Sequence, residues 1–226
     1  MAQCRMPANR GPKPSARSVN PEAGDYPIAD DPLEWAAAEA AARRSWQECP
    51  YYERRYGARG WRFTLSDSGW IATLCALPPP LAQQRIRWLR ELLMTRGMPS
   101  VLLERHLEFL HAELIGRAPE RAPGYSVIAA GVVWLRRERL QLLPESQLEH
   151  EASRFDAAAR DMPGSIPLMG TVLVGAVLDE LLGLSPGERS AITWALQRER
   201  FTAPWIDAVD RTVASVRQAA GGGLGH

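Results

Sequence analysis

Cysteine is scarce in this 226-residue chain, with single residues at Cys4, Cys49 and Cys75. They are too few and too widely spaced to form a disulfide framework or a cysteine-ligated metal site. A glycine-rich phosphate loop, a nucleophile elbow and a Cys-x-x-Cys redox motif are missing as well. The sequence therefore indicates no catalytic residue, no metal site and no particular cofactor.

Long apolar runs are also missing. The longest candidate, residues 168–184, is interrupted by Gly170, Thr171, Gly175 and the acidic pair Asp179 and Glu180, so it is not a transmembrane helix. The basic residues near the N-terminus are not followed by an apolar stretch, as they would be in a secretory signal. We therefore expect a cytoplasmic protein without a membrane partner.

The chain has almost no excess of charge, because its 27 basic and 26 acidic residues leave a net charge of +1. A protein with this balance has no global field that would draw it onto nucleic acid. A helix-turn-helix interpretation of residues 85–110 also fails, because the recognition helix would begin with apolar residues and carry Glu104 and Glu108. We expect no nucleic-acid partner.

The bulk composition, 46% apolar and 23% charged, is that of a globular protein. Residues 1–30 contain five prolines and few apolar side chains, which predicts a disordered proline-rich arm. Residues 220–226 contain four glycines and predict a flexible tail. Residues 31–219 remain as one helical domain.

Prolines, glycines and capping residues divide that domain into helices. Asp31 followed by Pro32 is typical of a helix start, and Gly97 is typical of a left-handed residue after a helix end. Residues 167–182 are apolar on nearly all sides, which predicts a central helix, whereas the alternation in residues 61–65 predicts a short extended stretch. The fold class that we predict is all-α, a single compact bundle of about eight or nine helices.

The segment 51–63 combines five aromatic residues with four arginines and is the first candidate site. Aromatic faces and guanidinium groups together suit a flat, anionic ligand. The same side chains also suit a lid over one end of the bundle, with arginines stacked on aromatic rings. Both interpretations stay open, and the residues of interest are Arg54, Arg55, Tyr56, Arg59 and Trp61.

His106 is the second candidate, because its position on the helical wheel falls among leucines on the apolar arc of its helix. A buried imidazole needs a partner, since an unsatisfied buried polar group costs about 1–3 kcal/mol. Hydrogen bonding inside the core is one way to satisfy it. Ligation of haem iron or another metal is the other.

Asp179 is the third candidate, on the same strip of its apolar helix as Val172 and Gly175. Burial would raise the pKa of its carboxyl, unless an arginine pairs with it and lowers the pKa. Gly175 removes a side chain one turn earlier, which permits either close helix packing or a ligand pocket. We expect an arginine partner for Asp179.

Two functional hypotheses follow from these features. The first is a non-catalytic helical protein that binds a partner protein, a second copy of itself or a small molecule, because no catalytic constellation is present and tryptophan, of which there are eight, is enriched at interfaces. The alternative is a protein or enzyme that binds haem or another cofactor in a globin-like pocket. In that case His106 would be an axial ligand, and Asp179 and the arginines near Tyr56 would line the pocket.

Overall fold

The computed structural model describes residues 14–184 and 189–222, and the remaining residues lie outside the described part. Regular structure in the described residues is helical, apart from an isolated β-bridge between Ser15 and Pro27. Eight of the α-helices have 13 residues or more, which confirms the all-α prediction. The elements are α1 (Ala16–Val19), α2 (Pro32–Glu48), α3 (Tyr51–Thr73), η1 (Leu74–Ala76), α4 (Pro79–Met94), α5 (Ser100–Arg117), η2 (Pro119–Arg121), α6 (Ala122–Leu140), α7 (Glu145–Ala159), α8 (Met169–Leu181), α9 (Ala191–Ala195) and α10 (Ala203–Gly222).

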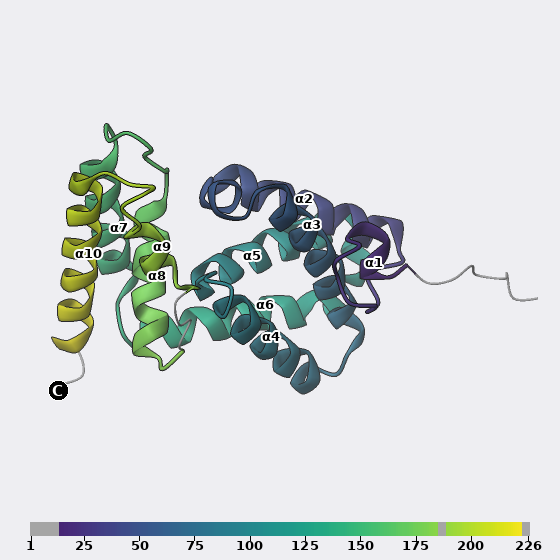
Figure 1. Cartoon of the computed structure of the whole chain (residues 1–226). Helices are drawn as coiled ribbons and strands as arrows, with labels where there is room; N and C mark the ends of the chain where they lie inside the picture. Colours follow the sequence, from purple (N-terminus) through teal and green to yellow (C-terminus); the bar gives the residue numbers. More distant parts are fainter. Residues whose placement is uncertain (1–13, 185–188, 223–226) are drawn as a thin grey trace, which may run out of the picture.

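The helices form one bundle with a core in two parts. Helices α1 to α6 make up one half of the molecule and α7 to α10 the other (Figure 1). One cluster of buried side chains joins α7, α8 and α10 to the start of α3, and a second joins α2, α4, α5 and α6. Met98, between α4 and α5, packs against both clusters, so the two parts of the core meet at the ends of these helices.

The N-terminal segment corrects the prediction of a disordered arm over residues 1–30. Residues 14–30 fold against α3 and bury Ala16, Ala23 and Ile28. The backbone N–H of Ala29 donates to the carbonyl of Gly69 at 3.0 Å, which ties the segment to α3. The composition of residues 14–30 does not predict this packing, because a few small apolar side chains and backbone hydrogen bonds are enough to hold the segment on α3. Residues 1–13 lie outside the described part.

Two further boundaries differ from the sequence prediction. Residues 61–65 are helical rather than extended, because α3 runs through them after a kink at Gly57, whose φ is 54°. A five-residue alternation is too short to outweigh tertiary packing. The flexible tail predicted for residues 220–226 is wrong for residues 220–222, because α10 continues to Gly222 and buries Ala220, and residues 223–226 lie outside the described part.

Helix α8 is buried along nearly its whole length, as its apolar circumference predicted. Two glycines let its neighbours approach closely. A Cβ atom on Gly170 would lie 2.1 Å from the carbonyl oxygen of Ala152 on α7, and one on Gly175 would lie 2.4 Å from Val101 Cγ1 on α5. Gly175 therefore permits close helix packing, which was one of its two predicted roles.

Helix α5 carries a buried carboxylate that joins three helices. Glu104, 3% exposed, accepts hydrogen bonds from Arg136 Nε at 2.8 Å and from Arg139 Nε at 2.8 Å, both on α6. Arg139 is itself buried and pairs with Glu145 of α7 at 2.7 Å. Because neither Glu104 nor Arg139 is exposed to water, each of these two charges needs the other as its partner.

None of the helices in the described residues is both long enough and apolar enough to cross a membrane.

Replacing Glu104 tests how much its carboxylate contributes to the free energy of unfolding. We expect Glu104→Ala to lower the free energy of unfolding by about 3–5 kcal/mol, because it leaves the buried Arg139 guanidinium without its main partner. Urea unfolding followed by circular dichroism measures the change. Glu39→Ala is the matched control, since Glu39 pairs with Arg43 on the surface and should cost less than about 1 kcal/mol. Equal effects of the two substitutions would contradict this interpretation.

Candidate functional site

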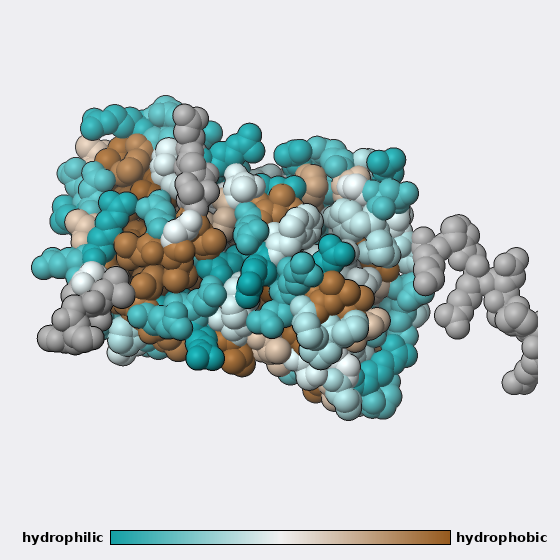
Figure 2. Space-filling view, turned by 90° about the horizontal axis from the view of Figure 1, so that it is seen from below, coloured by the Kyte–Doolittle hydropathy of each residue, from teal (hydrophilic) through white to brown (hydrophobic). Residues whose placement is uncertain are grey.

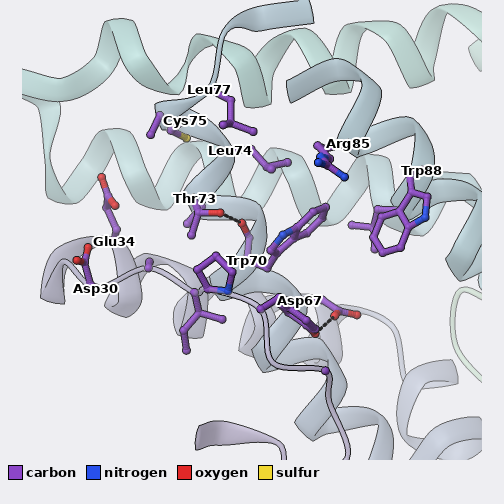
Figure 3. Close-up of a pocket in the computed structure, with 18 of the residues that line it drawn as sticks. Asp30, Glu34, Asp67, Trp70, Thr73, Leu74, Cys75, Leu77, Arg85 and Trp88 are labelled. Atoms are coloured by element: carbon purple, nitrogen blue, oxygen red, sulfur yellow. Dashed lines mark hydrogen bonds between the residues drawn. The ribbon is translucent and has the colours of Figure 1, made fainter. Parts of the chain in front are cut away.

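A cleft of about 1130 Å³ opens between the N-terminal segment, α3 and α4. One wall is formed by residues 22–30 together with α3, and the other by α4, while the loop around η1 and the start of α6 close one end. Figure 3 shows Trp70 of α3 lying between the labelled residues of η1 and Trp88 of α4. This cleft is larger than two other cavities among the described residues, which have volumes of about 400 Å³ and about 280 Å³.

Aromatic side chains form much of the lining. Trp70 and Trp88 meet edge to face with their ring centroids 5.7 Å apart, and Tyr26 approaches Trp70 in the same manner at 6.5 Å. Trp88 nevertheless leaves 51% of its surface exposed. The cleft therefore offers flat apolar faces that a ligand could cover.

Helix α4 has two adjacent faces with different environments. Ala82, Ile86, Leu89 and Leu93 are buried in the core. A second row, roughly 90° away on a helical wheel, faces the cleft and contains Arg85, Trp88 and Leu92, and Arg96 lines the cleft from the turn after α4. Because the spacings of three and four residues place this second row on one side, α4 presents a basic–aromatic–apolar stripe to the cleft.

The end of the cleft nearest α1 contains a hydrogen-bonded carboxyl. The Tyr26 hydroxyl donates to Asp67 Oδ1 at 3.0 Å, and burial raises the pKa of Asp67 to about 6. Burial and the neighbouring Asp67 carboxylate raise the pKa of Tyr26 to about 12, so the phenol keeps its proton. Nearby, Glu22 pairs with Arg59 at 2.6 Å and with Arg62 at 2.8 Å, which fastens the N-terminal segment to α3.

Two of the four arginines that line the cleft have no carboxylate partner among the described residues. Arg59 pairs with Glu22, and Arg121 pairs with Asp31 at 2.8 Å. Arg85 and Arg96 have no oxygen of an acidic side chain within 4.0 Å in this part of the chain. The guanidinium of Arg96 lies over the ring of Phe63, 5.1 Å from its centroid.

The aromatic–arginine segment predicted as one site is divided among several environments. Of its five candidate residues only Arg59 lines the cleft. Arg55 donates to the Tyr51 hydroxyl at 2.7 Å and to carbonyls of Arg189 and Ser190, so it ties α3 to the turn before α9.

The other three residues of that segment contact different neighbours. Arg54 is exposed and donates to the Gly164 carbonyl at 3.4 Å, and Tyr56 donates to the Arg96 carbonyl at 3.2 Å. Trp61 packs edge to face on Trp46 of α2, with centroids 5.5 Å apart. These contacts match the structural alternative for the segment, in which its aromatics and arginines hold elements together.

His106 lies at the junction of three helices and is 6% exposed. Its Nδ1 is 2.9 Å from Ser45 Oγ of α2 and its Nε2 is 3.0 Å from Ser68 Oγ of α3. Burial lowers the pKa of the imidazole to about 4, so the ring is neutral at pH 7. One ring nitrogen therefore donates to one serine and the other accepts from the second, which satisfies the ring without a metal.

Asp179 stabilises the start of α5 from the neighbouring helix α8. Its Oδ2 accepts from the backbone N–H of Ser100 at 2.6 Å, which is one of the amides that a helix leaves unpaired at its N-terminus. The expected arginine is Arg90, whose Nη2 is 4.0 Å from Asp179 Oδ1 and whose Nε donates to Ser100 Oγ at 2.8 Å. Burial dominates and raises the pKa of Asp179 to about 6.

Sequence reasoning missed most of the cleft. The sequence has Trp88, Ile86 and Leu89 in one apolar stripe of a helix, and that stripe is wider than one buried face requires. The excess width, with Arg85 one turn before Trp88, was the available signal that a second face of this helix is not covered by the core. No pattern in the sequence connects α4 to Tyr26 or Asp67.

The described residues contain no group of three or more histidine, cysteine or acidic side chains that could hold a metal ion. No protein-family model, curated protein or solved structure matches this chain. Functional inference therefore depends on the chemistry of the cleft.

The buried histidine gives a prediction for the pH dependence of stability. Because the pKa of His106 falls from 6.5 to about 4 on folding, its contribution is complete above pH 6.5 and is lost as the pH falls towards 4. The loss amounts to about 3 kcal/mol. The difference in unfolding free energy between wild type and His106→Gln, measured in urea at pH 7 and pH 4, should shrink by that amount.

His111→Gln is the control for this measurement, since His111 is partly exposed on the same helix. This variant should keep the wild-type pH dependence. A gap between wild type and His106→Gln that is the same at both pH values would show that the ring is not held neutral by burial.

Proposed function

We propose that the protein is a non-catalytic binding protein that holds a planar, largely apolar small molecule in the cleft between residues 22–30, α3 and α4. The observation that carries this proposal is the half-exposed Trp88 standing against Trp70 in a cleft of about 1130 Å³. Small-molecule sites are concave and mostly apolar, with a few polar groups that fix orientation, and this cleft has each of these properties. A bound ring would cover the exposed indole face.

The thiol in the cleft and the histidine nearest to it favour binding over catalysis. Burial raises the pKa of the Cys75 thiol to about 12, so the thiol in the lining stays protonated and is a poor nucleophile. The serine–histidine contacts around His106 have hydrogen-bonding distance but are buried, because Ser68 is fully enclosed and His106 is 6% exposed. A substrate in the cleft would not reach them.

A small molecule fits the observations better than a protein partner. The site is a hollow, whereas large protein interfaces are broad. Seen from below, the exposed apolar surface is divided between the half with α7–α10 and the half with α1–α6, with hydrophilic surface between the two areas (Figure 2). The partner-protein form of the hypothesis therefore has less support on this face.

The haem-binding alternative also has less support. Both ring nitrogens of His106 already have serine partners, and His106 does not line the cleft. Asp179 of α8 accepts from the start of α5 and likewise does not line the cleft. Addition of haemin should therefore produce no absorption band that His106→Gln removes.

The proposal is tested with the neutral fluorescent probe N-phenyl-1-naphthylamine, which has a flat apolar body. We expect its fluorescence to rise on binding to the wild type, and Trp88→Ala to weaken binding about tenfold through loss of an aromatic contact and its buried area. The melting temperature should change little, because Trp88 is half exposed.

Val133→Ala is the control, since Val133 is 65% exposed on α6 and does not line the cleft. It should bind the probe as the wild type does. Absence of binding to the wild type, or equal binding by Trp88→Ala and Val133→Ala, would overturn the proposed function.

A further inference from the structure

The cleft contains charged donors that a purely apolar ligand would leave unused. Arg85 lines it from α4, one turn before Trp88, and has no carboxylate partner among the described residues. In Figure 3 its guanidinium lies close to Trp70, between Leu74 and Trp88. A guanidinium beside an indole face suits a ligand that is both aromatic and anionic.

The charge of Arg85 has fewer interacting groups around it than the charge of Arg96, the other arginine of the cleft without a carboxylate partner. Arg96 lies over Phe63, and its charge opposes the rise in the pKa of Asp67 that burial causes, so it already interacts with a carboxyl of the cleft.

The acidic groups at the end of the cleft near η1 and α6 are distant from Arg85 or already paired with other side chains. Figure 3 shows Asp30 and Glu34 on the other side of the cleft from Arg85 and Trp88. Glu34 accepts from Arg121 at 3.3 Å and from the Tyr125 hydroxyl at 3.1 Å. The part of the cleft around Arg85 therefore has a positive charge without a counter-charge.

We infer that the ligand of the cleft is a planar aromatic anion whose acidic group pairs with Arg85 and whose rings lie against Trp88 and Trp70. This inference rests on the proposed function and adds the charge and orientation of the ligand. The anion is a carboxylate, sulfonate or phosphate, since each presents two oxygens to the forked N–H groups of arginine. Trp88 supplies the flat surface because half of it is free.

Two probes with the same rings separate the charge from the apolar body. 8-Anilinonaphthalene-1-sulfonate is N-phenyl-1-naphthylamine with an added sulfonate. We expect Arg85→Gln to weaken binding of the sulfonate about tenfold, as loss of one charge-assisted hydrogen-bonding partner does. Binding of the neutral probe should change less than about twofold, because the aromatic wall is intact.

Arg137→Gln is the matched control, because Arg137 is an exposed arginine of α6 outside the cleft. It should leave both affinities unchanged. Arg96→Gln decides between the two arginines: a larger loss of sulfonate binding in this variant than in Arg85→Gln would overturn the assignment to Arg85.

The outcomes distinguish this inference from the proposed function. If the wild type binds the neutral probe and Arg85→Gln weakens both probes equally or neither, the inference fails and the proposed function stands. If the wild type binds neither probe, both fail. Sedimentation at the protein concentration of the titration tests a second copy as occupant, and a dimer that the probes fail to dissociate would overturn a small-molecule site.

Discussion

The need to satisfy the buried polar groups of α5 determines how the other helices are arranged. Glu104 requires the arginines of α6, His106 requires a serine from each of α2 and α3, and the amide of Ser100 at the helix start requires Asp179 of α8. Each partner comes from a different part of the chain. Because an unmatched buried charge or donor is costly, these contacts select one arrangement of helices among the many that apolar packing would allow.

The same arrangement leaves α4 with an uncovered side. Its buried face packs into the core that it shares with α2, α5 and α6, so the adjacent row with Trp88 is held in place without being covered. The N-terminal segment supplies the facing wall, fastened by the Tyr26–Asp67 hydrogen bond and by the pairs of Glu22 with two arginines. The cleft therefore results from the way in which the N-terminal segment, α3 and α4 pack together.

Charge is distributed differently in the core and in the cleft. In the core each buried charge has a partner: Glu104 has Arg139, and Arg90 has Glu138 together with the more distant Asp179. In the cleft, Arg85 has none among the described residues. Because Arg85 is exposed, water satisfies its charge, and the guanidinium stays available for the anionic ligand proposed above.

Local signals in the sequence determined the helices and most of their ends. Asp31 caps α2 through hydrogen bonds to the amides of Leu33 and Glu34, and Gly97 adopts the left-handed conformation predicted for it. These features depend on neighbouring residues alone, so they can be recognised without a structure. The burial of His106 and Asp179 was also predictable, because an apolar helical face shows which positions turn inward.

Only the tertiary structure decided what those buried groups contact and where the cleft lies. Ser45 and Ser68 are 61 and 38 residues away from His106, and no spacing rule connects them. The chain likewise gives no indication that Tyr26 meets Asp67, or which of two adjacent faces of α4 is covered. Such contacts depend on the relative positions of whole helices, which are set by packing across the bundle rather than by the residues of any one segment.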